Sequence, residues 1–150
     1  MIKTDFPAPA FQLREQEGKE QIFDALRRRW VRLTPEEWVR QNMVQLLTLV
    51  AGYPAALVGI EKEIWVASQK KRFDLLVYNR LHQPWMLIEC KAMDVDLTAQ
   101  TLEQVLRYHA AVPVEFLLIS NGTYTYGWRK LPDHRLLELH QLPAFPETSI

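Results

Sequence analysis

The sequence predicts an α/β fold in which a mixed central sheet is flanked by helices. Two segments, 34–50 and 98–110, carry apolar residues at helical spacing, and several short apolar runs have strand character. Along the chain the order is helix, three strands, helix and then further strands. Because each helix must bury an apolar stripe against another layer, a mixed sheet with helices packed on it is the natural arrangement.

The first helix has clear start and stop signals. Thr34 is a favourable N-cap, Pro35 suits the first turn, and Glu37 stands three residues after the cap. Gly52 and Pro54 end the helix. The inward positions are expected to be Trp38, Val39, Met43, Leu46, Leu47 and Val50.

The two ends of the chain carry weaker patterns. Residues 1–16 contain two prolines and no clear period, so we expect an extended arm pinned by Phe6 and Phe11. Residues 18–33 show loosely helical apolar spacing, which favours a helix there. Residues 141–150 are expected to form an irregular tail. A length of 150 residues suits a single domain over residues 1–150.

The remaining elements follow from apolar runs and turn signals. Strands are expected at 58–67, 73–79, 85–91, 114–120, 123–128 and 135–139. The turn-sized gap RLHQP joins the second and third of these as a hairpin, and Asn121-Gly122 marks another turn. The second helix, 98–110, is expected to turn inward Leu102, Val105, Leu106 and His109.

Composition limits the class of protein. The formal net charge of zero argues against a protein that coats nucleic acid by charge alone, although a local basic face is compatible with it. Cys90 is the single cysteine, so an internal disulfide is impossible and a reducing compartment fits. No apolar run approaches the roughly 18 residues needed to span a bilayer, and the N-terminus lacks signal-peptide features. We therefore expect a cytoplasmic protein without a membrane partner.

The predicted hairpin brings together three residues that can carry chemistry. Asp74 and Glu89 are equidistant from a turn centred between Leu81 and His82, so they are expected to lie opposite each other on antiparallel strands. Directly opposed side chains have Cβ atoms about 4.5–5.5 Å apart. Lys91 follows Glu89 by two residues and shares its face of the strand.

This grouping favours a metal site. Two opposed carboxylates repel each other, and a divalent cation between them removes the repulsion. Carboxylate oxygens suit Mg²⁺ or Mn²⁺, and the Cys90 backbone carbonyl is a further candidate ligand. Such an ion lowers the pKa of bound water, while Lys91 can stabilise developing negative charge. The alternative is a solvent-facing hairpin with an Asp74–Lys91 cross-strand pair.

These residues carry a family resemblance. Asp74, fourteen further residues and then Glu89-Cys90-Lys91 resemble the motif of PD-(D/E)xK nucleases, although Phe73 stands where that name has proline. The stretch from Trp30 through Thr34-Pro35-Glu36-Glu37-Trp38-Val39-Arg40-Gln41 to Ser120-Asn121-Gly122 resembles the N-terminal nuclease domain of type I restriction enzyme R subunits, in a short stand-alone form. The resemblance implies a restriction-endonuclease-like α-β-β-β-α-β core.

The resemblance also implies further site residues. Glu37 would be an additional metal-site acid, but a capping box with Thr34 explains it without any metal. Gln104 and Tyr108 resemble a Gln-x-x-x-Tyr motif and share one helix face, where they could reach the site or a DNA phosphate. The alternative is an exposed helix face with a tyrosine at its edge.

Two hypotheses about function remain. The first is a Mg²⁺- or Mn²⁺-dependent nuclease acting on DNA, with RNA as an open alternative, in which Lys70, Lys71 and Arg72 help to hold the strand. For these basic residues the alternative is a solvated surface run. The second is a nuclease-like DNA-binding or assembly module that forms a homodimer or docks on a separate helicase or methyltransferase. The chain contains no G-x-x-x-x-G-K-[ST] phosphate-binding loop, so we do not expect ATP-driven translocation from this chain itself.

Overall fold

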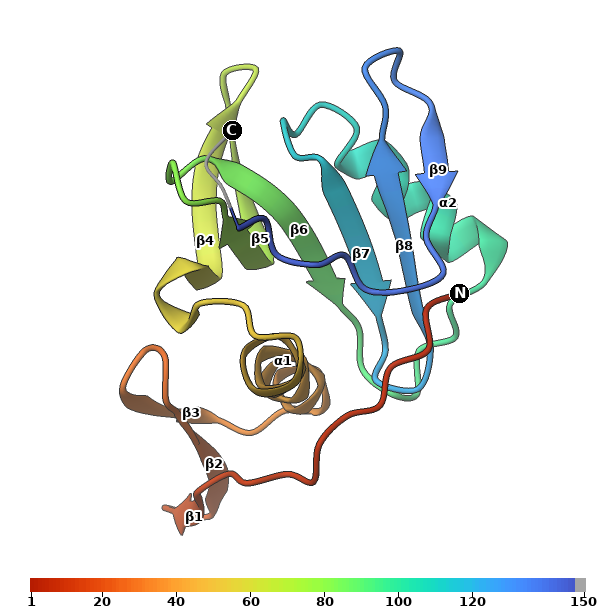
Figure 1. The fold of residues 1–150 in the computed structure, drawn as a ribbon. Coiled ribbons are helices and arrows are strands. Elements are labelled where there is room, and N and C mark those ends of the chain that lie inside the picture. The colour runs from red at the N-terminus through yellow and green to blue at the C-terminus, as the bar shows by residue number, and fades with distance from the viewer. Residues whose placement is uncertain (148–150) are drawn as a thin grey trace.

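A computed structural model of the chain describes residues 1–147 (Figure 1). The two α-helices are α1, Pro35–Gln45, and α2, Ala99–Tyr108. The strands are β1 (Leu13–Gln16), β2 (Lys19–Asp24), β3 (Arg29–Arg32), β4 (Val58–Val66), β5 (Gln69–Tyr78), β6 (Pro84–Cys90), β7 (Phe116–Ser120), β8 (Thr125–Lys130) and β9 (Leu136–Glu138).

The main sheet has six strands in the order β4-β5-β6-β7-β8-β9. Strands β6 and β7 are parallel, with α2 as their crossover, and the other neighbours are antiparallel. Helices α1 and α2 lie on opposite faces of the sheet (Figure 1). The predicted mixed sheet flanked by helices is therefore confirmed, and the order α1, β4, β5, β6, α2, β7 matches the expected α-β-β-β-α-β core.

Each face of the sheet has its own apolar core. The core on the α1 side includes Val39 and Met43 of the helix, packed against Leu75, Ile88 and Leu118 of the strands. The core on the α2 side consists mainly of Phe73, Leu76, Leu87 and Leu117, with Leu106 of α2 packed against them. The central strands bury both faces, which explains why their sequences are nearly continuous apolar runs.

The segment 18–33 is not the expected helix. It forms the hairpin β2–β3, which joins β1 in a three-stranded sheet beside α1 (Figure 1). The Asp24 side chain accepts hydrogen bonds from the backbone N–H groups of Leu26 and Arg27, and Arg28 adopts a φ of 54°. These turn contacts favour a hairpin over a helix.

The N-terminal arm is shorter than expected. The predicted extended arm over residues 1–16 ends at Gln12, because Leu13–Gln16 pair with β2. Ile2 is pinned by a bridge to Thr125 of the main sheet, and its amide donates to the Thr125 carbonyl at 2.8 Å. Phe11 contacts the Trp38 ring with centroids 5.3 Å apart, and Phe6 packs against the core, so the two predicted anchors are confirmed.

Helix α1 begins and ends as its sequence signals predict, with one exception. Thr34 Oγ1 accepts the Glu37 amide at 3.0 Å, and Gly52 ends the helix with a φ of 72°. The last turn, Leu46–Val50, is π-helical. The wider turn rotates the later side chains away from the expected stripe, so Val50 is 58% exposed rather than inward.

The later elements follow the expected pattern. Helix α2 has Thr98 as its N-cap and buries Val105 and His109. Gly122, in the predicted Asn121-Gly122 turn, has a φ of 87°. Residues 141–147 contain no helix or strand, as expected for the tail, and 148–150 lie outside the described residues. Between residues 1 and 147, neither α-helix is long and apolar enough to cross a membrane.

Candidate functional site

The β5–β6 hairpin has the register that its turn predicts. Leu75 pairs with Ile88 and Leu76 with Leu87, so Asp74 and Glu89 occupy the next opposed position. The β5–β6 ladder stops before this position, because the backbone N–H of Cys90 donates to the Asp74 side chain instead of to the backbone of β5. Asp74 Oδ2 accepts the backbone N–H of Cys90 at 2.9 Å. The strands therefore open at the position of the predicted site.

Asp74 is buried, with 9% of its surface exposed, and both of its oxygens have partners. Oδ2 binds the Cys90 amide, and Oδ1 accepts from Arg40 Nη2 of helix α1 at 2.8 Å. Burial and, next, the negative charge of Glu89 raise the pKa of Asp74 to about 6 despite these hydrogen bonds. The charge of Glu89 thus acts on the Asp74 carboxylate.

Glu89 leaves its strand on the side of α2. Its neighbours Ile88 and Cys90 lie in the core on the α1 side, and adjacent residues of a strand alternate. Glu89 Oε2 lies 3.4 Å from Nε2 of His109, the C-cap of α2. The expectation that Asp74 and Glu89 share one face of the sheet is therefore wrong, because Asp74 is directed toward Arg40 of α1 and Glu89 toward His109 at the end of α2.

Lys91 lies beside Glu89 as predicted. Its Nζ is 4.0 Å from Glu89 Oε1, and its side chain is partly exposed. Its amide donates to the Ser120 carbonyl of β7 at 2.8 Å. Asn121 Nδ2 donates to the Val95 carbonyl at 2.9 Å and so fixes the loop that follows Lys91. The Ser120-Asn121-Gly122 turn thus supports the strand end that carries Lys91.

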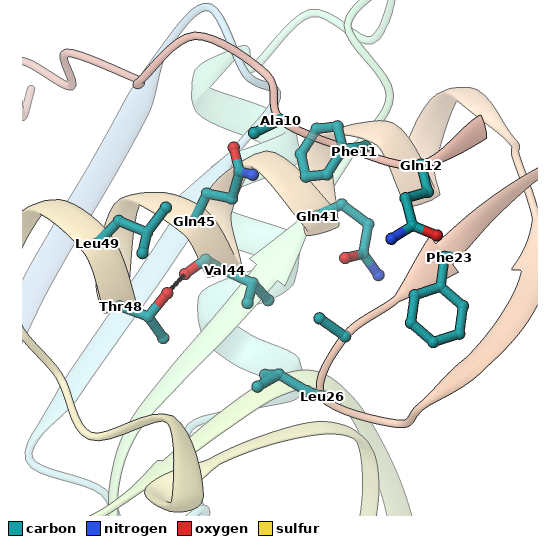
Figure 2. A pocket seen from close by; sticks show the side chains of 11 residues that line it. Ala10, Phe11, Gln12, Phe23, Leu26, Gln41, Val44, Gln45, Thr48 and Leu49 are labelled. Atoms are coloured by element: carbon teal, nitrogen blue, oxygen red, sulfur yellow. Dashed lines mark hydrogen bonds between the residues drawn. The ribbon is translucent and has the colours of Figure 1, made fainter.

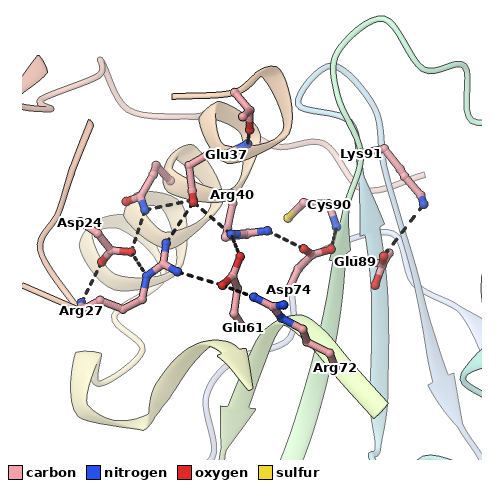
Figure 3. Close-up of polar contacts among 12 residues, drawn as sticks. Asp24, Arg27, Glu37, Arg40, Glu61, Arg72, Asp74, Glu89, Cys90 and Lys91 are labelled. Carbon is pink, nitrogen blue, oxygen red and sulfur yellow. Dashed lines mark hydrogen bonds and ion pairs between the residues drawn. The ribbon is translucent and has the colours of Figure 1, made fainter. Parts of the chain in front are cut away.

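An ionic cluster that the sequence analysis missed adjoins Asp74 (Figure 3). Arg40 Nη1 binds Glu37 Oε1 at 3.0 Å and Glu61 Oε1 at 2.8 Å, in addition to the Arg40–Asp74 bond. Although burial opposes the charged guanidinium, Glu37 and Asp74 raise the pKa of Arg40 above its ordinary value. Arg27 joins the same cluster from the β2–β3 turn through Asp24, Glu37 and Glu61.

Two signals in the sequence pointed to these missed residues. Arg40 follows Glu37 by one helical turn, at a spacing that places them on one face of the helix. Glu61 occupies the position opposite Asp74 in the β4–β5 hairpin, because Ile60 pairs with Leu75 and Lys62 with Phe73. Glu89 occupies the corresponding position in the β5–β6 hairpin.

Glu61 also has an unusual backbone. Its φ is 51°, in the left-handed region, in the middle of strand β4. Such a conformation costs free energy for a non-glycine residue and clusters at functional sites. Here it directs the carboxylate toward Arg27, Arg40 and Arg72. Although burial acts in the other direction, the hydrogen bond from Arg72 and the charge of Arg40 lower the pKa of Glu61.

Glu37 combines parts of both expected roles. Thr34 caps its amide, so the start of the helix is satisfied as in half of a capping box. The Glu37 side chain is buried and binds Arg27 and Arg40. Glu37 is therefore connected to Asp74 through the Arg40 guanidinium.

The predicted nucleic-acid contacts lie on two sides of the sheet. Arg72 and Lys70 are on the exposed part of β5, where Arg72 pairs with Glu61 and Lys70 with Glu63. Lys71 points to the other side, where its Nζ donates to the Tyr108 carbonyl at 2.6 Å and lies 4.6 Å from the Tyr108 ring centroid.

The two predicted contacts on α2 are both exposed. Gln104 and Tyr108 lie one turn apart on the helix. The Tyr108 ring contacts His109, which in turn lies beside Glu89, so the end of α2 that carries Tyr108 is adjacent to the site.

Asp74 and Glu89 offer oxygen atoms, which are the ligands that a hard cation prefers. In residues 1–147 no three His, Cys, Asp or Glu side chains form a ready-made metal group, since Arg40 lies among Glu37, Glu61 and Asp74. Burial and, after it, the charge of Glu89 raise the pKa of Asp74, so some repulsion acts between the two carboxylates. Oxygen ligands and this repulsion fit Mg²⁺ or Mn²⁺. The Cys90 thiol is fully buried in the core, which agrees with a packing role.

A separate apolar pocket of about 210 Å³ lies between the N-terminal segment, the β2–β3 turn and α1 (Figure 2). Phe11, Phe23 and Leu49 are among its lining residues. Gln41, also in the lining, donates to Asp24 of the ionic cluster at 3.0 Å. The pocket thus borders the cluster from the side away from Lys91.

Comparison with known proteins gives one family. No curated protein matches the chain. Residues 35–146, well over half of the chain, match the family described as type I restriction enzyme R protein N terminus (HSDR_N). That range begins at α1 and includes Glu37, Asp74, Glu89 and Lys91. On this match and its α/β core, the chain belongs to the type I restriction enzyme R protein N-terminal family and has a restriction-endonuclease-like domain.

Proposed function

We propose that this protein is a metal-dependent nuclease that hydrolyses phosphodiester bonds in DNA, with Mg²⁺ or Mn²⁺ as cofactor. One observation supports the proposal: at the open end of the β5–β6 hairpin the charge of Glu89 acts on the Asp74 carboxylate, which the Cys90 amide holds, and Lys91 Nζ lies 4.0 Å from Glu89 Oε1. Membership of a restriction-enzyme family supports the same activity.

The metal ion would be held by the carboxylates of Asp74 and Glu89, with the Cys90 carbonyl as a further ligand. Glu37 would act as an additional acid, connected to Asp74 by Arg40. When bound, the ion supplies positive charge to the phosphoryl group and lowers the pKa of water.

The chain's own residues orient these groups and stabilise charge. The Cys90 amide and Arg40 hold the two oxygens of Asp74 in one orientation. The contact with His109 restricts the side chain of Glu89. The partly exposed ammonium of Lys91 donates hydrogen bonds to the phosphoryl oxygens as negative charge develops on them, or positions the attacking water.

The substrate strand would cross the open end of the hairpin. Lys70 and Arg72 flank it on one side of the sheet, and Gln104, Tyr108 and Lys71 on the other. These residues would bind phosphates by charge and hydrogen bonding, which carry no sequence information. DNA is the proposed partner, and RNA is the alternative substrate that the same chemistry accepts.

The test is incubation of the purified protein with linear, circular and single-stranded DNA, first with Mg²⁺ or Mn²⁺ and then with EDTA. We expect metal-dependent degradation that Lys91→Ala abolishes while the folded state is retained. Lys19→Ala, which removes an exposed lysine of the three-stranded sheet, is the matched control and should cleave normally. Cleavage by the Lys91→Ala variant at the wild-type rate would remove Lys91 from the mechanism.

The buried guanidinium of Arg40 favours a second candidate function. Arg40 already neutralises Asp74 and Glu37, which is what a nuclease-like module without catalysis would require. Such a module would bind DNA as a homodimer or together with a separate helicase or methyltransferase. Tight DNA binding without product in the assay above would select this function.

A further inference from the structure

We infer that the outer part of the β4–β5 hairpin binds an unpaired segment of nucleic acid, with Trp65 stacking on a base. The inference rests on the proposed function, because it identifies the surface that would lead the substrate strand to Asp74. β4 and β5 pair as far as Val66 and Gln69, whereas β5 pairs with β6 only as far as Leu75. The outer hairpin therefore extends beyond the β5–β6 ladder (Figure 1).

Trp65 differs from the other tryptophans. It is 72% exposed at the outer end of β4. Trp30, Trp38, Trp85 and Trp128 each contact another aromatic ring, and within residues 1–147 Trp65 has no such partner. Trp65 therefore neither fills a core nor covers the sheet. A single exposed apolar residue is ordinary on a protein surface, so what distinguishes Trp65 is the row of basic side chains beside it.

The Trp65 side chain is on the same side of the hairpin as the candidate site. Ile64 and Val66 belong to the core on the α2 side, so Trp65, between them, points to the α1 side. Lys70 is paired directly opposite Trp65, and the next row on this side is Arg72 opposite Glu63. Arg72 binds Glu61, which shares Arg40 with Asp74. Trp65, Lys70 and Arg72 thus form a row that ends at Asp74.

The charge of the hairpin matches a phosphate backbone. Residues 62–72 contain Lys62, Lys70, Lys71 and Arg72 against the single acid Glu63, in a chain of zero net charge. The ion pair between Lys70 Nζ and Glu63 Oε2, at 2.8 Å, joins two half-exposed side chains. Exposed ion pairs contribute little stability, so Lys70 can exchange its partner for a phosphate at low cost.

Aromatic stacking beside a basic row selects unpaired bases. The face of a base is accessible to a tryptophan ring only when the base is unstacked from its neighbours. Stacking tolerates every base, because each has a π-face, and basic side chains along the row follow the backbone. The predicted ligand is therefore a single-stranded segment, recognised without sequence preference.

The test measures binding of a fluorescein-labelled oligothymidylate by anisotropy in EDTA, so that cleavage cannot affect the result. Trp65→Ala should weaken binding about tenfold, and Trp65→Phe should retain most of the affinity. Tyr124→Ala, which removes another half-exposed aromatic residue before β8, is the matched control and should bind like the wild type. Thermal melts check that all variants are folded.

Other outcomes separate this inference from the proposed function. Wild-type affinity in Trp65→Ala, or no binding by the wild-type protein, overturns the inference even if the protein cleaves DNA. Unchanged binding together with a loss of self-association in sedimentation would identify Trp65 as a protein contact and also overturn it. Binding that depends on Trp65, with no cleavage in Mg²⁺ or Mn²⁺, supports the inference while the proposed nuclease activity fails.

Discussion

Arg40 shows at the residue scale how the candidate site combines stability with chemistry. Its guanidinium is buried and binds Glu37, Glu61 and Asp74, which come from a helix and two strands. In residues 1–147 its Nε is buried without a hydrogen-bond partner, so the guanidinium uses its two terminal nitrogens for the three acids. Removing one member of such a cluster leaves buried charges without compensation.

Arg40→Met should therefore destabilise the protein. The variant keeps most of the side-chain volume but leaves three carboxylates without their shared cation. We expect the free energy of unfolding at neutral pH to fall by about 3–5 kcal/mol, measured by urea denaturation. Arg129→Met, at a half-exposed arginine of β8, should change it by less than about 1 kcal/mol. A similar small effect for both variants would contradict the assigned role of Arg40.

Asp74 allows a test of the metal ligands that does not depend on activity. Asp74→Asn keeps the shape of the side chain but removes its negative charge. Under the proposed function, calorimetric titration with Mn²⁺ should give clearly weaker binding for the variant than for the wild type. Asp133→Asn, at an exposed aspartate before β9, is the control. Equal affinities of the Asp74 variant and the wild type would contradict the ligand assignment.

At the scale of elements, the β2–β3 turn depends on a charged carboxylate. Asp24 is fully buried and accepts the amides of Leu26 and Arg27 and the side chain of Gln41. Burial alone would raise its pKa, but the hydrogen bonds and the charge of Arg27 lower the pKa of Asp24 below its ordinary value. The turn thus connects the three-stranded sheet to α1 through Asp24.

This predicts a pH dependence with a defined sign. Because the folded pKa of Asp24 lies below its unfolded value of about 3.9, its stabilisation is complete above that value. It is lost as the pH falls through the folded pKa. Asp24→Asn should therefore lower stability at pH 7, and urea midpoints should fall less steeply on acidification than those of the wild type. Parallel pH profiles for the two proteins would exclude this contribution.

At the scale of the whole molecule, charge is balanced overall but divided locally. The formal net charge is zero, while the outer β4–β5 hairpin is basic and the Arg40 cluster contains four acids. Acids and arginines pair within the cluster, so few cations near the site are available for phosphates. Lys70, Arg72 and Lys91 lie at or near the open ladder end.

Single-stranded DNA binding should therefore depend only modestly on salt. With about three phosphate contacts, log Kobs should fall with log salt at a slope of about −2. Anisotropy titrations over a series of NaCl concentrations measure this slope. A slope steeper than about −5 would indicate a wide basic surface that the balanced charge does not predict.

The sequence predicted the elements best where the deciding interactions are local. The cap of Thr34, the end at Gly52 and the register of Asp74 against Glu89 depend on residues close along the chain. The prediction of a helix at 18–33 was wrong because the turn contacts of Asp24 and the pairing of β2 with β1 and β3 decide the structure of that segment. The exposed position of Trp65 was not predicted, because the alternation of side chains along a strand does not show which part of a sheet is left without a packed layer.

By itself, the sequence determined the order of α1, the three strands, α2 and the following strands, and it predicted Asp74, Glu89 and Lys91 as one group. Turn length and side-chain periodicity are enough for that, because both act over a few residues. Only the tertiary structure decided that Arg40 and Glu61 join Asp74, that His109 contacts Glu89, and that the pairing of β5 with β6 stops at Leu75 and Ile88. Those contacts depend on how segments far apart in the chain pack together, which no local pattern encodes.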